Sequence, residues 1–177
     1  MTMIYAICKI LSFPGTYLRA FLEHLTAKAS GCMIESDGYI RFDELSGHIE
    51  HTFPLKKGGA VAMALVPGIF HFIFGVFFSI AGLVPLALLK VDFQHPPMCV
   101  IYILFTFLGI SMLCNLFPLV DDALFCRERI YGKDGANIVA KILLFIPVHI
   151  CVLGAYIERY CVNYIIFAAF LILIFIK

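Results

Sequence analysis

"AVAMALVPGIFHFIFGVFFSIAGLVPLALL", residues Ala60 to Leu89, is the stretch that decides the fold of this chain. It holds no Asp, Glu, Lys or Arg, and His71 is its single ionisable side chain. A helix needs about 20 mostly apolar residues to cross the hydrocarbon core of a bilayer, which is about 30 Å thick. The stretch exceeds that length. We therefore predict a tilted membrane-spanning helix over 60–89.

The whole chain shares this apolar character. Its 177 residues are 62% hydrophobic and 14% charged, whereas soluble domains average about 45–50% apolar and about 25% charged residues. A small domain cannot bury that much apolar surface in one core, because a large share of its surface stays exposed. The formal net charge of +1 creates no field that would attract nucleic acid. We predict an integral membrane protein whose partner is the lipid bilayer, with no nucleic-acid partner.

Four further apolar segments complete the predicted fold, which is an all-α bundle of four to five membrane segments in a single domain, 1–177. Two polar loops separate them. Asp37-Gly38 lies inside the alternating run "CMIESDGYIRF", and this pair is typical of a β-hairpin turn in the first loop. The predicted segments are 3–29, 60–89, 97–120, 137–157 and 160–176, and the loops are 30–57 and 121–136.

Basic residues predict how the bundle is oriented. If all five segments cross, the two polar loops share one side of the membrane, and they and their flanks carry most of the Lys and Arg residues. Cytoplasmic loops of membrane proteins have such an excess. We expect a multi-pass protein of the cell membrane, with its N-terminus outside and its C-terminus in the cytoplasm.

One face of the 60–89 segment is lined by small residues. Gly68, Gly75 and Gly82 recur every seven residues, and small residues let membrane helices approach closely. His71 falls on the same face, so we expect it to point into the bundle. An ionisable group inside a membrane is a functional candidate. The alternative is a neutral imidazole that bonds to a neighbouring helix.

Three polar clusters meet on the predicted cytoplasmic side: "RAFLEHLTAKASG" (19–31), "GHIEH" (47–51) and "NLFPLVDD" (115–122). Imidazole and carboxylate side chains are ligands that suit Zn²⁺, although solvated loop histidines are the simpler explanation of "GHIEH". We predict no cofactor, with zinc as the alternative at His24, His48, His51 and Asp121 or Asp122. The candidate polar site consists of Arg19, Glu23, His24, His71, Asn115, Asp121 and Asp122.

The order of these motifs resembles that of the site-2-protease-like membrane zinc metallopeptidases. "AKASG" (27–31), the hairpin-like loop, "ALVPGIFHFIFG" (64–75) and "NLFP" (115–118) match in sequence over about 16–124. The chain is also similar to small bacterial integral membrane proteins with the order "EH…GHIEH…NLFP". The resemblance implies a membrane helix with H-E-x-x-H, where two histidines bind zinc and the glutamate is the general base, and an aspartate after "NLFP" as the third ligand.

At the centre of that motif the chain departs from the family. The resemblance puts Arg19 at the first histidine, Ala20 at the glutamate and Glu23 at the second histidine. Arg19 and Glu23 lie four residues apart and can pair on one helix face. We therefore expect Arg19 to replace the positive charge of the metal, held between Glu23 and Asp121 or Asp122. The alternative is an arginine that reaches the membrane interface with no specific partner.

Three functions are compatible with these patterns. The first is a non-catalytic, site-2-protease-like membrane protein that binds a membrane protein or peptide in a groove along the glycine face. The second is a metal-dependent intramembrane hydrolase or protease with an unconventional His/Asp site. The third is a small transporter component that uses Arg19, Glu23 and His71 as its path. The sequence does not specify an oligomeric state.

Overall fold

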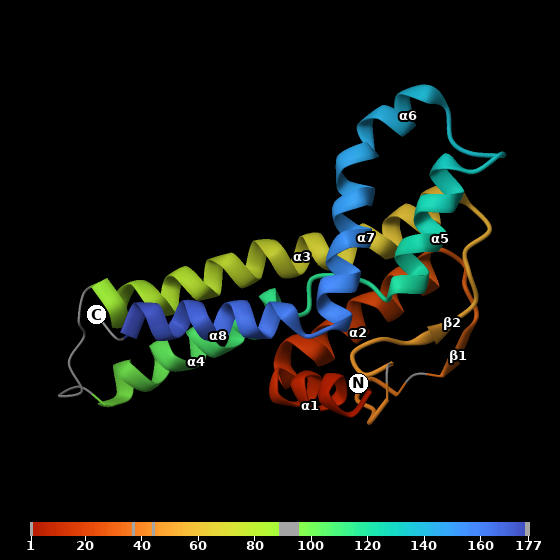
Figure 1. Ribbon diagram of the computed structural model, residues 1–177. Helices are drawn as coiled ribbons and strands as arrows, with labels where there is room; N and C mark the ends of the chain where they lie inside the picture. Colours follow the sequence, from red (N-terminus) through yellow and green to blue (C-terminus); the bar gives the residue numbers. More distant parts are fainter. Residues whose placement is uncertain (1, 37, 44, 89–95, 176–177) are drawn as a thin grey trace.

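The structure is mostly helical and includes one two-stranded antiparallel sheet (Figure 1). This computed structural model describes residues 2–36, 38–43, 45–88 and 96–175. Within these ranges the predicted helical class is confirmed. The elements are α1 (Thr2–Leu11), α2 (Phe13–Ala29), β1 (Ile34–Ser36), β2 (Glu50–His51), α3 (Lys57–Leu83), the π-helical turn η1 (Val84–Leu88), α4 (Pro96–Leu113), α5 (Val120–Tyr131), α6 (Ile138–Leu143), α7 (Phe145–Arg159) and α8 (Val162–Phe175).

The apolar stretch that begins at Ala60 forms most of α3 and the η1 turn that follows it. Among the described residues, one helix, Lys57–Ala87, is by itself long and apolar enough to cross a membrane. The bent pair α7 and α8 would be a second if the two form one span. Leu89, the last residue of the predicted segment, lies outside the described residues.

The glycine face of α3 packs against α4 and the residues that follow it. A β-carbon added at Gly75 would contact Leu113, and one added at Gly68 would lie 2.5 Å from the carbonyl oxygen of Leu116. Small residues therefore bring the two backbones together, as they do between membrane helices. The groove expected along this face is filled by the protein itself.

This close approach predicts a large effect for Gly82→Ala. The new β-carbon would lie 2.5 Å from both the Thr106 backbone nitrogen and the Tyr102 carbonyl oxygen, so the helices would have to separate. We expect a loss of about 1–3 kcal/mol in the free energy of unfolding, measured by denaturant titration in detergent. The matched control is Gly58→Ala in the same helix, where an added β-carbon meets no atom within 4 Å. An equal loss in both variants would contradict this packing.

The boundaries around "NLFP" differ from the prediction. α4 ends at Leu113, not at residue 120, because Asn115 turns its side chain back to bond Ser111 and Pro118 has no N–H for a continuing helix. The predicted loop 121–136 is instead largely helical, as α5. Asp121 and Asp122 lie in the first turn of α5, where the helix dipole favours carboxylates.

The first polar loop contains a strand pair, but not the predicted hairpin around Asp37-Gly38. β1 pairs with β2, with Ile34 opposite His51, so the strands are joined by a long connection and not by a tight turn. Asp37 itself lies outside the described residues. The run after Gly38 folds back over α2 instead, where Ile49 is buried against Ala20.

The C-terminal third bends sharply. The predicted segment 137–157 divides into α6 and α7, and α8 leaves α7 at an angle of 79° (Figure 1). The bend occurs at Tyr160 and Cys161, two to three residues beyond the turn expected at Glu158, and Cys161 has a left-handed backbone with φ 59°. The predicted end of the last segment, residue 176, lies outside the described residues.

Candidate functional site

Arg19 and Glu23 lie one turn apart on α2, and both point into the protein. The Arg19 side chain is fully buried; its Nη1 donates to the Leu116 carbonyl at 2.9 Å, and its Nε lies 3.9 Å from Glu23 Oε2. Within the described residues, Nε and Nη2 have no hydrogen-bond partner. Arg19 therefore pairs with Glu23 as expected, but its second contact is a backbone carbonyl of "NLFP" and not Asp121 or Asp122.

Ala20 lies where the resemblance places the general base. It has no exposed surface and packs in an apolar cluster with Ala27, Ile49 and Met63. Ile49 comes from the loop between the strands, so this loop contributes to the cluster that encloses Ala20. The environment of Ala20 is therefore apolar and closed.

Glu23 has polar contacts with α2 and with the "GHIEH" segment. Its Oε2 contacts His48 Nδ1 at 2.8 Å, and its Oε1 accepts a hydrogen bond from the Ile49 backbone N–H at 3.2 Å. His51 Nε2 lies 3.7 Å from the same Oε1. A buried carboxylate needs such partners because an unpaired buried charge is costly. The "GHIEH" loop thus forms a cap over Glu23.

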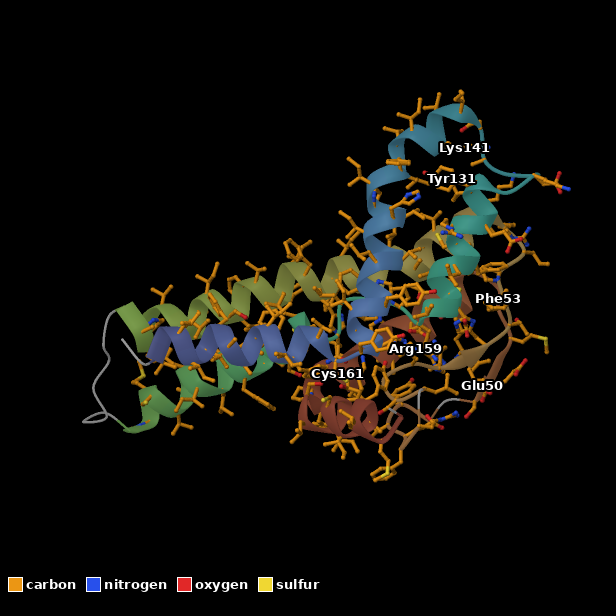
Figure 2. All side chains as sticks on the ribbon, in the orientation of Figure 1. Glu50, Phe53, Tyr131, Lys141, Arg159 and Cys161 are labelled. Carbon is orange, nitrogen blue, oxygen red and sulfur yellow. The ribbon has the colours of Figure 1, made fainter. Side chains whose placement is uncertain are left out.

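His51 connects Glu23 to α5. Its Nε2 lies 3.7 Å from Asp122 Oδ2 as well as from Glu23. Phe53 stacks on Phe125 of α5, with ring centroids 4.2 Å apart, and this contact holds the strand end beside that helix (Figure 2). Burial disfavours the charged imidazole, but the hydrogen bond and charge of Asp122, with the charge of Glu23, outweigh it and raise the pKa of His51 to about 9.

The ligand atoms of Glu23, His51 and Asp122 all lie within 4.8 Å of one another. This is the group that could hold a metal ion among the described residues, and it differs from the predicted set. His24 contacts the Tyr39 hydroxyl at 3.2 Å, away from this group. Asp121 is exposed, whereas its neighbour Asp122 is half-buried and belongs to the group. Of the predicted ligands, His51 and Asp122 belong to this group, whereas His24, His48 and Asp121 do not.

His71 is completely buried on the glycine face of α3. Its Nδ1 lies 2.9 Å from the Pro67 carbonyl and its Nε2 lies 3.1 Å from the Gly15 carbonyl of α2. A neutral imidazole carries one N–H and can donate to one of these carbonyls. The contact with the Gly15 carbonyl links α3 to α2. It matches the alternative given above, in which His71 bonds to a neighbouring helix.

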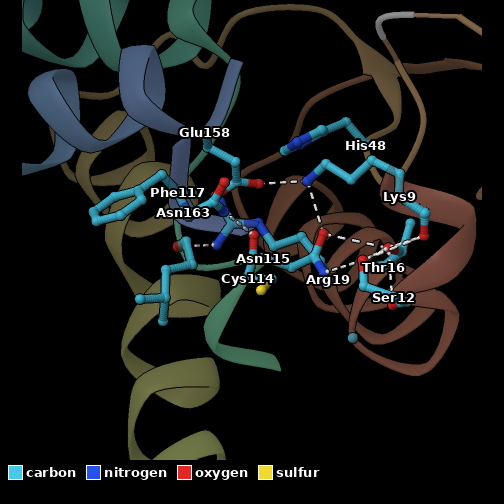
Figure 3. A network of polar contacts seen from close by, with 12 residues as sticks. Lys9, Ser12, Thr16, Arg19, His48, Cys114, Asn115, Phe117, Glu158 and Asn163 are labelled. Carbon is cyan, nitrogen blue, oxygen red and sulfur yellow. Dashed lines mark hydrogen bonds and ion pairs between the residues drawn. The ribbon is translucent and has the colours of Figure 1, made fainter. Parts of the chain in front are cut away.

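A second buried centre surrounds Lys9 (Figure 3). Lys9 Nζ donates to Asn115 Oδ1 at 2.7 Å and forms an ion pair with Glu158. Glu158 Oε2 accepts a hydrogen bond from the Phe117 backbone N–H at 3.0 Å. Asn115 Nδ2 in turn donates to Ser12 Oγ at 3.0 Å. This network joins α1, the segment after α4 and the end of α7.

Lys9 and Glu158 were not among the predicted site residues. Lys9 interrupts the predicted apolar segment 3–29 and Glu158 directly follows the segment 137–157, and buried charges are usually paired. The sequence therefore contained a hint of this pair, but Arg159 is a second charged residue at the same end of the segment. Which of the two side chains is buried depends on which face of α7 turns inward, and the sequence does not show that.

No known protein family, curated protein or solved structure matches this chain.

Proposed function

We propose that this chain is a non-catalytic, site-2-protease-like integral membrane protein that binds a membrane protein or peptide. The observation that carries the proposal is the closed environment of Ala20, which has no exposed surface and is covered by Ile49. Cleavage of a peptide bond would need a general base at this position and access for the peptide. The methyl group of Ala20 is not a base, and its burial in a cluster with Ile49 leaves no access.

Membrane insertion is supported by the surface of α3. A core helix of a soluble protein is mostly buried. In the helix Lys57–Ala87, by contrast, only 28% of the most apolar stretch of 18 residues is buried inside the protein. Its outward side chains are large and apolar; Phe72, Ile73 and Phe77 are 57–63% exposed. Figure 2 shows such side chains projecting along α3, α4 and α8. Lipid tails satisfy this surface, whereas water does not.

Loss of catalysis is supported by the charges at the site. In the metallopeptidase arrangement, a glutamate accepts a proton from metal-bound water. Ala20 cannot accept a proton, and the Arg19 guanidinium places a positive charge 3.9 Å from Glu23. Both substitutions act against water activation at this position.

The partner is expected on the outer faces of the helices, because α4 fills the glycine face of α3. Phe107 on α4, like Phe72 on α3, is turned outward. A transmembrane helix with small and apolar residues would suit these faces, since packing between membrane helices depends on close contact.

The catalytic half is tested by peptide hydrolysis. The purified protein in detergent with Zn²⁺ should cleave a fluorogenic membrane peptide no faster than Asp122→Asn, because the general base is absent. Both should match the rate without protein. Turnover by the wild-type chain that disappears in Asp122→Asn would overturn this half of the proposal.

The binding half is tested by photocrosslinking in intact membranes. A benzophenone amino acid at Phe72 should give one discrete protein adduct, whereas the same probe at Leu55, which is 89% exposed in the loop before α3, should give none. The absence of an adduct from both Phe72 and Phe107 would contradict a partner on these faces.

A further inference from the structure

We propose that Glu23, His51 and Asp122 bind one divalent transition-metal ion, for which Zn²⁺ is the probe. The site goes beyond the proposed function, since it requires no peptide partner and no catalysis. It differs from the ligand set that the family resemblance implies: Arg19 occupies the first histidine position, a carboxylate, Glu23, occupies the second, and the one histidine ligand, His51, comes from β2. The three ligands come from α2, β2 and α5.

The spacing of the three side chains suits a tetrahedral ion. Zinc binds nitrogen and oxygen at about 2.0–2.2 Å, so neighbouring ligand atoms lie roughly 3.3–3.6 Å apart. His51 Nε2 lies 3.7 Å from Glu23 Oε1 and 3.7 Å from Asp122 Oδ2. The ligand atoms of all three residues lie within 4.8 Å of one another, so the side chains would have to close in slightly around the ion. One coordination position remains for water.

The groups around the ligands orient them for metal binding. His51 Nδ1 lies 3.1 Å from the Thr52 carbonyl, so the N–H on Nδ1 can donate there while Nε2 faces the carboxylates. Ligating histidines usually hold their second nitrogen in this way. His48 Nδ1, 2.8 Å from Glu23 Oε2, likewise fixes the carboxylate that would bind the ion through Oε1.

The carboxylates of Glu23 and Asp122 supply two negative charges for a cation, against the one positive charge of Arg19, whose Nε lies 3.9 Å from Glu23 Oε2. Two carboxylates and an imidazole converge, with His51 Nε2 3.7 Å from both Glu23 Oε1 and Asp122 Oδ2. A divalent ion between them would neutralise both carboxylates. Imidazole and carboxylate together suit zinc and the neighbouring first-row ions.

The ion would act as a clamp on the loop that covers Ala20. β1 and β2 are joined at two paired positions, Ile34 with His51 and Ser36 with Glu50. A metal bound through His51 would tie the end of this ribbon to α2 and α5 at once. Because Ala20 supplies no general base, water on the fourth position would not be activated in the manner of the metallopeptidases.

Metal content of the purified protein tests the site. The full chain, carrying no histidine tag, is stripped with EDTA in detergent, incubated with zinc sulfate, desalted and analysed by mass spectrometry for zinc per protein. The wild type should hold about one equivalent, and His51→Gln and Asp122→Asn less than about a tenth. The matched controls Asp121→Asn and His24→Gln change neighbouring residues of the same types and should still hold about one.

Thermal unfolding provides the second measurement. Zinc should raise the melting temperature of the wild type and of Asp121→Asn but not that of Asp122→Asn, because only a bound ion stabilises the folded state. If His51→Gln fails to fold, the conservative Asp122→Asn variant still decides the result. A wild type with less than about a tenth of an equivalent, or equal zinc in Asp122→Asn and Asp121→Asn, would overturn the site. Peptide cleavage by a zinc-loaded protein would instead contradict the proposed function and leave the metal site intact.

Discussion

Lys9→Met should lower the free energy of unfolding by about 3–5 kcal/mol, the cost of removing one partner of a buried ion pair. The Lys9 side chain has no exposed surface, and Glu158 is equally enclosed. The substitution keeps the length of the side chain but leaves the Glu158 carboxylate without its cation. The Asn115 amide oxygen, 2.7 Å from Lys9 Nζ, also loses its main donor. Denaturant titration in detergent would measure the loss.

Two controls separate charge from packing. Lys28→Met changes an exposed lysine of α2 and should alter stability little. The double variant Lys9→Met/Glu158→Gln leaves no unpaired charge, and Gln can still accept the hydrogen bond from the Phe117 N–H. It should therefore recover much of the loss, since neutral replacements of buried ion pairs are often tolerated. A double variant that is less stable than Lys9→Met would show that packing, not charge, is decisive.

Ala20→Glu should also cost about 3–5 kcal/mol, because it buries a carboxylate without a partner. This substitution restores the glutamate of the metallopeptidase motif, yet the position lies in an apolar cluster under Ile49. The expected result is a destabilised protein with no gain in peptide hydrolysis. Thermal unfolding and the fluorogenic peptide assay measure the two effects in one preparation.

Ala29→Glu is the matched control, because Ala29 lies at the exposed end of the same helix α2. It should lower stability by less than about 1 kcal/mol, from an unfavourable charge at the helix C-terminus. If Ala20→Glu were as stable as Ala29→Glu, the loop carrying Ile49 would have to open readily. That outcome would contradict the closed position on which the non-catalytic function is proposed.

Local patterns account for the parts of the fold that could be predicted. The glycine spacing of Gly68, Gly75 and Gly82 depends only on helix periodicity, and α3 packs along that face. The i, i+4 spacing of Arg19 and Glu23 likewise predicted their pairing. The prediction of a tight hairpin around Asp37-Gly38 was wrong. Strand pairing depends on contacts with the rest of the protein, and here Ile34 pairs with His51.

The candidate site shows where local reasoning ends. Asp121 and Asp122 are adjacent and chemically identical, and the register of α5 decides that Asp122 meets His51. The same applies to His48 and His51: one contacts Glu23 alone and the other bridges to α5. Sequence identifies the residue types, but a rotation of about 100° per helical residue decides which atoms converge.

The distance along the chain between Lys9 and Glu158 also has a consequence for biosynthesis. The two residues are 149 positions apart, and chains are made at about 5–20 residues per second, so Lys9 leaves the ribosome roughly 7–30 seconds before its partner. During that time its ammonium group must stay hydrated or be neutralised by other means, because an unpaired buried charge is costly. We therefore expect α1 to settle into place after the C-terminal helices have formed, although it is made before them.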